Sequence, residues 1–238
     1  MQIEAGLLAV LALAVLAFMY RRRRASVRRM RGQVFDACLP LFDSYRVTQD
    51  DLSFAVLDGD YRGHEVRLEP VSDDLAVRKV PSLWLLVTVQ GRVPFAGSFD
   101  LLIRPQNTEF YSPSEDWSDT VRLPAGWPEH ARIRTDRPEA MPPLELLARH
   151  IGVFADPRAK EMVVTPHGVR LVYQADQANR SYYLVLRQSE FSNLAFSAHM
   201  VRNLLDRAVA LFDDLVAAGP GLATQAKRLE QGVELASQ

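Results

Sequence analysis

The first apolar stretch of the chain is also its longest. From Ala5 to Tyr20 no charged or strongly polar side chain occurs, and with Ile3 included the run covers about 18 residues, or roughly 27 Å as a helix. Alanine and leucine dominate it, so its helix propensity is high. Phe18 and Tyr20 stand where interfacial aromatic residues sit at a bilayer surface. The pattern predicts a transmembrane anchor over residues 1–20.

A basic juxtamembrane segment, residues 21–32, follows at once. We call its arginines the arginine collar: Arg21, Arg22, Arg23, Arg24, Arg28, Arg29 and Arg31. A cleavable signal peptide carries its positive charge before the apolar run, so this order argues against secretion. Arginines beside a span stay in the cytosol. We therefore expect a single-pass protein of a bacterial inner membrane, with Met1–Glu4 outside and everything after Arg21 inside, and a collar that contacts anionic lipid headgroups.

Shorter apolar patterns fill the first part of the cytosolic region, which we expect to form an α+β domain over residues 33–218. Residues 34–44 place their apolar side chains at helical spacing, with Pro40 as a kink or early break. Residues 52–71 alternate around the turn sequence DGDYRG and predict a β-hairpin. Further strands are predicted at 83–91, 99–105 and 108–112.

A connector rich in proline and charge, residues 113–142, separates these elements from a second set and holds at most one short strand. The second set begins with an amphipathic helix at 144–154. A hairpin with the turn TPHG follows at 161–175, then a strand at 181–188. A long helix over 192–218 ends at the Gly-Pro-Gly sequence 219–221, which leaves 219–238 as a flexible tail.

The two sets share an order of helix, hairpin and strand. Both hairpins have glycine beside histidine at the turn and then Val-Arg-Leu, at 66–68 and 169–171. One interpretation is a duplicated helix-hairpin-strand unit, with subunits 33–112 and 143–218 joined by the connector. The other is that two hairpins are alike without common origin. The sequence leaves both open.

Charge separates the collar from the rest. Residues 1–31 carry seven arginines and one acid, which gives +6, and because the whole chain carries −1 the remainder carries −7. A basic patch beside a membrane, without interleaved aromatic residues and backed by an acidic body, argues against a nucleic-acid partner. The single cysteine, Cys38, cannot form an intrachain disulfide, and its place on an apolar face predicts a small buried hydrophobic side chain.

Candidate chemistry is scarce. No two histidines have the spacing of a metal motif, and neither a nucleophile elbow nor a phosphate-binding glycine loop occurs, so we expect no catalytic residues, metal or cofactor. In or near the connector are acids that could do acid–base work but are more typical of a solvated loop: Glu109, Glu115, Asp116 and Asp119. The histidines are His64, His130, His150, His167 and His199.

Two tryptophans in the connector, Trp117 and Trp127, are the candidate surface for an unknown protein partner, against the alternative that they pack back on the domain. The leading hypothesis is a non-catalytic binding or scaffold domain held at the membrane. One alternative is a membrane-associated enzyme whose site cannot be read from the sequence.

The other alternative is a ligand sensor. Receptors for cyclic dinucleotides of the PilZ type carry R-x-x-x-R and D-x-S-x-x-G motifs. Arg24 and Arg28 match the first, and Asp51 and Ser53 begin the second, but Val56 stands where the glycine is required. The match resembles that family only in part, so no residue role is carried over.

Overall fold

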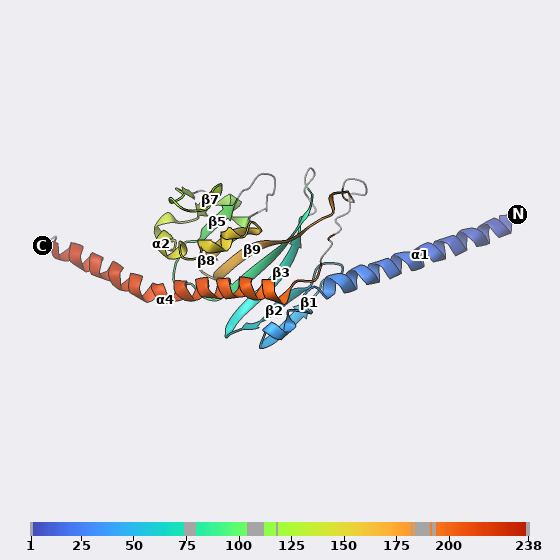
Figure 1. Ribbon diagram of the computed structural model, residues 1–238, viewed down its shortest axis with the longest axis horizontal. Helices are drawn as coiled ribbons and strands as arrows, with labels where there is room; N and C mark the ends of the chain where they lie inside the picture. Colours follow the sequence, from blue (N-terminus) through green and yellow to red (C-terminus); the bar gives the residue numbers. More distant parts are fainter. Residues whose placement is uncertain are drawn as a thin grey trace.

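The computed structural model describes residues 2–73, 80–103, 112–117, 119–181, 183, 191 and 194–236. It is a mixed α+β fold, as the apolar pattern predicts, built on one large antiparallel sheet. Figure 1 shows α1, in blue, leaving the sheet at one end and the C-terminal part of α4, in red, leaving it at the other.

The sheet has nine strands in the order β1-β2-β3-β4-β9-β8-β5-β7-β6, and all neighbours are antiparallel. Strand β4 lies near its middle and is apolar on both faces, as expected for a central strand. The strands are β1 Ser44–Thr48, β2 Val56–Tyr61, β3 His64–Ser72, β4 Ser82–Gln90, β5 Phe99–Ile103, β6 Asp119–Val121, β7 Ala131–Thr135, β8 Ala159–Thr165 and β9 Gly168–Gln177.

Three α-helices have both of their ends in the described part of the chain, and short 3-10 helices fill connections. The long ones are α1 and α4, at the two ends of the sequence. The α-helices are α1 Gln2–Gly32, α2 Leu144–Leu147 and α4 Ala198–Ala236, and the 3-10 helices are η1 Leu39–Leu41, η2 Pro113–Asp116, η3 Pro138–Ala140 and η4 Ile151–Ala155.

The main core lies between one face of the sheet and α4, which packs against β4 and β9 (Figure 1). The alternation of β4 sends Leu85 and Val87 into this core and Trp84 and Leu86 to the opposite face. The predicted apolar face of α4 is confirmed, because its buried side chains recur every three or four positions: Val201, Leu204, Leu205, Ala208, Leu211 and Leu215.

Both predicted hairpins are confirmed, as is the strand predicted at 83–91. In the first hairpin the turn is shorter than DGDYRG: only Arg62 and Gly63 connect β2 to β3, with φ of 53° and 78°. Two consecutive residues with positive φ match the strand twist of a tight hairpin. The second hairpin turns at Pro166 and His167.

The sheet joins the two predicted subunits. Strand β4 of the first pairs with β9 of the second, and β5 pairs with β8. The connector also belongs to the sheet, because it supplies β6 and β7 rather than at most one strand. The duplication itself stays a prediction.

Two predicted helices are wrong in form. Residues 34–44 form turns and η1, and β1 begins at Ser44. Their hydrogen bonds run mainly to the third residue back, for example from Leu41 N–H to the Cys38 carbonyl at 2.9 Å, since Pro40 has no N–H to continue an α-helix. The helix predicted at 144–154 is likewise split into α2 and η4.

The end of the chain differs as well. The long helix begins at Ala198 rather than 192 and continues through 219–221 to Ala236, so the predicted stop at Gly-Pro-Gly is wrong. A Cβ at Gly219 would lie 2.3 Å from the Pro94 ring, so this glycine allows close packing rather than helix termination. Figure 1 shows α4 changing direction in its red part, in keeping with a proline inside a helix.

Two predicted strands fall largely outside the described residues. In 108–112, only Ser112 is described. In 181–188, only Ser181 and Tyr183 are described, and both are helical: the Tyr183 N–H donates to the Asn179 carbonyl at 2.9 Å. The strand prediction is therefore wrong at its start.

Candidate functional site

The described side chains in the apolar part of α1 are exposed. Val10, Leu13, Phe18 and Tyr20 are each about two-thirds exposed, 65, 66, 65 and 65%. Positions 10 to 20 make about three helical turns, so apolar side chains surround the helix on every side. Within the part of the chain that the structure describes, no helix is both long enough and apolar enough to cross a membrane.

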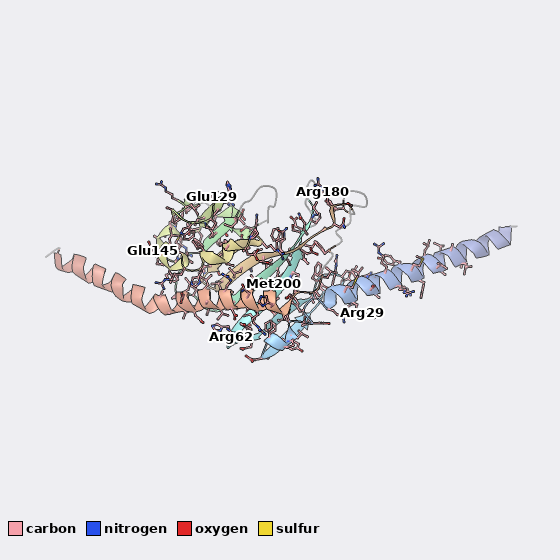
Figure 2. All side chains as sticks on the ribbon, in the orientation of Figure 1. Arg29, Arg62, Glu129, Glu145, Arg180 and Met200 are labelled. Atoms are coloured by element: carbon pink, nitrogen blue, oxygen red, sulfur yellow. The ribbon has the colours of Figure 1, made fainter. Side chains whose placement is uncertain are left out.

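The arginine collar occupies the end of α1 nearest the sheet, where Figure 2 labels Arg29. Two of its members fasten α1 to the loop after β1. Arg24 holds both carboxylate oxygens of Asp51, at 2.6 and 2.8 Å. Arg31 donates to the Leu52 carbonyl at 2.8 Å, and its guanidinium lies 4.8 Å from the Phe54 ring centroid. The collar thus attaches α1 to the domain, and we call the contacts of Arg24 and Arg31 the joint; it also provides a basic surface.

The joint uses one side of the helix. Arg24 and Arg31 are seven residues apart and therefore share a face. Arg22 and Arg29 lie roughly on the opposite side, and Arg21 and Arg28 lie between the two faces. These last four side chains are exposed. The fold therefore leaves a basic surface available on α1 while the Arg24 side is occupied by the domain.

The same contacts bear on the sensor alternative. Arg24 belongs to the first motif and Asp51 to the second, and the two side chains form an ion pair with each other. The guanidinium that would bind a nucleotide phosphate is therefore already paired. Val56 is the first residue of β2. The sensor alternative stays a prediction.

The two connector tryptophans are not brought together at one surface. Trp127 is only 9% exposed and packs edge-on against Phe99, with ring centroids 6.4 Å apart. It belongs to the core, in agreement with the alternative that the tryptophans pack back on the domain. Trp117 is half-buried and directly follows η2, where its backbone N–H donates to the Ser114 carbonyl. A partner contact at Trp117 stays a prediction.

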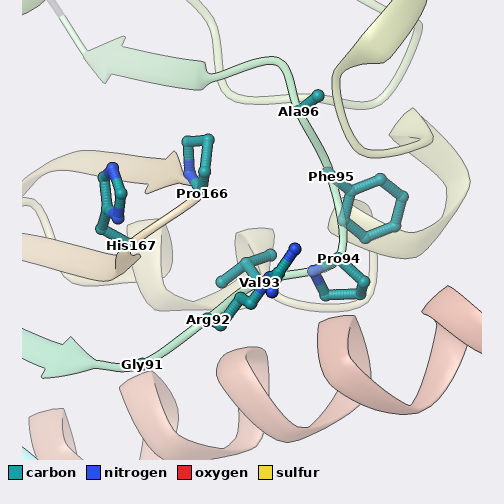
Figure 3. Close-up of a pocket in the computed structure, with 8 residues that line it drawn as sticks. All are labelled: Gly91, Arg92, Val93, Pro94, Phe95, Ala96, Pro166 and His167. Atoms are coloured by element: carbon teal, nitrogen blue, oxygen red, sulfur yellow. The ribbon is translucent and has the colours of Figure 1, made fainter.

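An open groove of about 1100 Å³ lies where the β4–β5 connection meets the β8–β9 turn (Figure 3). The run 91–96 forms one wall, and Pro166 and His167 form the other. The backbone ties the walls together, since the Gly91 N–H donates to the His167 carbonyl at 3.1 Å. Arg92 and His167 are its ionisable side chains, so the groove has no pair of groups arranged for acid–base chemistry.

A second hollow, which we call the α4 cleft, lies between the first turns of α4 and the segment 149–156. Two adjoining cavities of about 340 and about 220 Å³ form it, and both are lined by Val153, Asn203 and Arg207. Figure 2 labels Met200, one of its lining residues, on α4. The cleft combines an apolar floor from the sheet with a polar rim from the helices.

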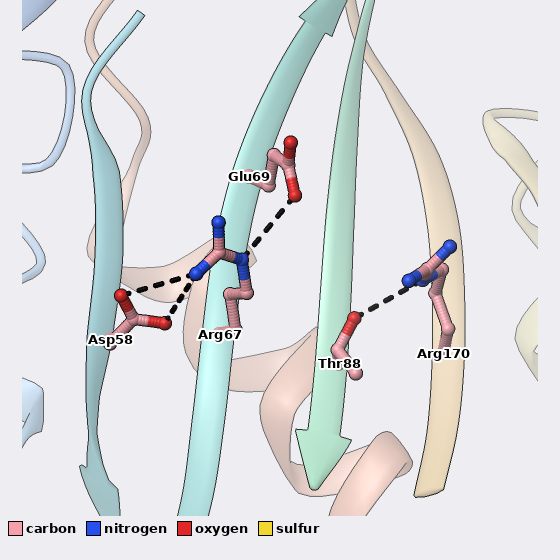
Figure 4. Close-up of polar contacts among 5 residues, drawn as sticks. All are labelled: Asp58, Arg67, Glu69, Thr88 and Arg170. Carbon is pink, nitrogen blue, oxygen red and sulfur yellow. Dashed lines mark hydrogen bonds and ion pairs between the residues drawn. The ribbon is translucent and has the colours of Figure 1, made fainter. Parts of the chain in front are cut away.

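The face of the sheet away from α4 carries polar side chains in rows across the strands (Figure 4). Arg67 on β3 pairs with Asp58 on β2 at 3.0 Å and with Glu69 on its own strand at 3.4 Å. Arg170 on β9 donates to the Thr88 hydroxyl on β4 at 3.2 Å. Cross-strand pairs of this kind fix the strand register.

Further along this face two acids are buried together. Asp100 on β5 and Glu161 on β8 have 0 and 1% of their surface exposed. The Ser114 hydroxyl donates to Asp100 Oδ2. Asp100 Oδ1 and both oxygens of Glu161 have no donor in hydrogen-bonding geometry among the described residues. A proton shared between the two carboxyl groups accounts for this arrangement, because a protonated Glu161 can donate to Asp100.

Burial raises the pKa of both acids. For Glu161 the negative charge of Asp100 adds to the effect of burial, while the neighbouring Ser112 side chain and then the charge of Arg170 oppose it. For Asp100 the Ser114 hydrogen bond and the charges of Arg132 and Arg134 on β7 oppose burial in part. Because the two acids interact, they titrate as a pair, and burial favours the protonated form of each.

The other candidate residues, Cys38 and the histidines, behave as ordinary structural residues where the structure places them in contacts. Cys38 is fully buried, and burial raises the pKa of its thiol to about 11, so it stays a protonated, unreactive thiol. His64 and His150 each contact an aspartate of α4, Asp213 at 2.8 Å and Asp214 at 3.0 Å. Among the described residues no cluster of three or more potential ligands could hold a metal ion.

Sequence reasoning missed the acid pair. The signal was an acid inside each of two strands that are largely apolar, FDLLI and AKEMVVT. Such an acid needs a buried partner, but the two are far apart in the sequence and meet only through the β5–β8 register.

Comparisons with known proteins add little. The sequence matches no protein-family model and no curated protein. The structure is similar to the crystal structure of the mycobacterial trehalose monomycolate transport factor A, TtfA, with a TM-score of 0.39 and 13% sequence identity over 82% of this chain and 94% of that chain. A likeness at this level carries no argument about function.

Proposed function

We propose that this chain is a single-pass inner-membrane protein that presents a cytosolic, non-catalytic binding or scaffold domain. The observation that carries the proposal is α1, a single helix whose described apolar side chains are exposed on all sides before it enters the arginine collar. Apolar side chains exposed all round a helix need an apolar surrounding, which a bilayer supplies.

The collar supports the direction of insertion. Positive charge beside a span is retained in the cytosol, so the sheet lies on the cytosolic side. The exposed arginines on α1, Arg21, Arg22, Arg28 and Arg29, are placed to contact anionic headgroups. The Arg24–Asp51 pair and the Arg31 contacts attach the domain to the same helix, so the domain sits close to the membrane surface.

Binding rather than catalysis fits the site geometry. The two acids whose pKa values are raised by burial, Asp100 and Glu161, line neither the groove nor the α4 cleft, so a substrate in either of these does not reach them. The α4 cleft, by contrast, offers an apolar floor and cationic groups at its rim, which is the composition of a binding site.

Membrane fractionation tests the tether. We expect the full chain to stay with the membranes after extraction with alkaline carbonate. The double variant Leu13→Arg/Leu16→Arg should be released, because each arginine near the middle of a span costs about 2.5–3.5 kcal/mol. The control Leu13→Ala/Leu16→Ala keeps the run apolar and should remain. Release of the unaltered chain, or retention of the arginine variant, contradicts the proposal.

A further inference from the structure

The α4 cleft has the length of a small elongated ligand. Its α4 wall is formed by His199, Asn203, Arg207 and Ala210, which follow one another along a single side of the helix. From the first to the last of these the helix rises about 16 Å. The opposite wall is the segment 149–156, which the split between α2 and η4 brings alongside α4.

The floor of the cleft is apolar. Met162 on β8 and Leu171 on β9 come from the sheet, Val153 from η4 and Leu204 from α4. All four side chains are less than 9% exposed, so they form part of the packed core and present a fixed surface. A hydrocarbon group laid on this floor removes apolar area from water at little cost in protein ordering.

The charges at the rim are unbalanced in favour of an anion. Asp206 is already occupied, because it accepts from the Tyr61 hydroxyl at 2.6 Å and pairs with Arg62 at 2.7 Å. Asp156 accepts from the Tyr173 hydroxyl at 2.8 Å and from the Arg158 N–H at 2.9 Å. Arg62 therefore cancels the charge of Asp206, whereas Asp156 keeps its charge, so the two lining arginines exceed the uncancelled lining acids by one positive charge.

The arginines of the rim are not held in this way. Arg149 is exposed, and Arg207 uses its Nε to donate to Asn203 at 2.9 Å, which orients the guanidinium but leaves its terminal groups for a ligand. The first turn of α4 closes one end of the cleft at His199 and Met200, and the N-terminal end of a helix favours negative charge.

We propose that the α4 cleft binds a small anionic amphiphile, a carboxylate on a medium-length hydrocarbon chain, with its head at Arg149 and Arg207 and its chain on the floor. The inference rests on the proposed function only in treating the domain as a binding module. It does not depend on the membrane tether, because the cleft is built from α4, η4 and the sheet.

Photo-crosslinking of the full chain in its membrane tests the inference. The probe is a decanoate analogue carrying a diazirine, and the labelled positions are mapped by mass spectrometry. The neutral alcohol with the same diazirine chain controls for charge. Gly152→Trp fills the cleft: Gly152 lines it, its φ is not left-handed, and a Cβ there meets nothing within 4 Å, so the fold tolerates the change.

We expect labelling within 149–156 and 199–210. Gly152→Trp and Arg149→Ala/Arg207→Ala should each lower it about tenfold or more, as loss of a charge-assisted contact does. Arg202→Ala, an exposed arginine of α4 that does not line the cleft, should leave it unchanged. Equal labelling by the alcohol, or full labelling of Gly152→Trp, overturns the inference.

The two proposals fail separately. Label confined to α1 overturns the cleft inference and leaves the tether intact. Cleft labelling of a chain that fractionates as a soluble protein overturns the tether and supports the cleft. Thermal unfolding of each variant establishes that loss of labelling does not come from loss of the fold.

Discussion

Gly168→Ala lowers the free energy of unfolding by about 3 kcal/mol, a large share of the roughly 5–15 kcal/mol by which domains are stable. Gly168 opens β9 with φ of 146°, where alanine is strained. A Cβ at this position lies 2.2 Å from the backbone carbonyl oxygen of Val89, in the β4–β9 ladder. Backbone strain and overpacking each cost about 1–3 kcal/mol.

The other hairpin supplies the matched control. Gly63 also has a left-handed φ, 78°, but a Cβ there meets nothing within 4 Å. Gly63→Ala therefore has backbone strain but no clash, and it should lower the free energy of unfolding by about 1 kcal/mol. Thermal unfolding of the three proteins in one detergent, followed by circular dichroism, measures both losses. Equal losses for the two variants contradict the close approach of β9 to β4.

The fold loses stability as the pH rises from 6 to 9, and Glu161 is the main cause. Burial raises the pKa of Glu161 to about 8 and that of Asp100 to about 6, above the ordinary values of 4.5 and 3.8. A carboxyl group whose pKa is higher in the fold stabilises it fully below the ordinary value, and that contribution is lost as the pH rises through the folded value. We expect a loss on the order of 2–3 kcal/mol.

Glu161→Gln isolates this effect. The amide keeps the shape of the protonated acid and can donate to Asp100. The free energy of unfolding of the variant should therefore change little over the same pH range, and at pH 9 the variant should be more stable than the unaltered chain. Because the two proteins differ only at residue 161, the difference between their stabilities cancels the pH dependence that they share.

The pH comparison has its own control. Glu145→Gln changes an exposed acid of α2 and should follow the unaltered chain at every pH. If Glu161→Gln loses as much stability as the unaltered chain between pH 6 and 9, the two acids do not share a buried proton.

Local sequence patterns predict the elements that depend on local physics. The strand at 83–91 and both hairpins follow from the sequence because alternation and turn residues act over a few positions. The pattern at 34–44 is misleading, since apolar side chains at helical spacing also fit compact turns, and only the bonding around Pro40 separates the two. Strand β7, ARIRT, was missed although its alternation sends Ile133 to the core and the two arginines to the opposite face of the sheet.

The site residues are harder to predict, because they depend on distant pairing. The α4 cleft requires 149–156 to lie beside α4, and the acid pair requires β5 to meet β8. Gly219 shows the same limit at one position: glycine before proline is typical of a helix end, and only the contact with Pro94 shows its use here. The collar was predicted as a basic surface, but its use as a joint through Arg24 was not.

The orientation of the domain tests the central claim most directly. A reporter fused after Gln238 distinguishes the two sides of the inner membrane, because green fluorescent protein exported through the general secretion pathway does not fluoresce, whereas alkaline phosphatase is active only outside. We expect a fluorescent, membrane-bound fusion and an inactive phosphatase fusion, because the proposed topology places everything after Arg21 in the cytosol. An active phosphatase with a dark fluorescent fusion would contradict this orientation.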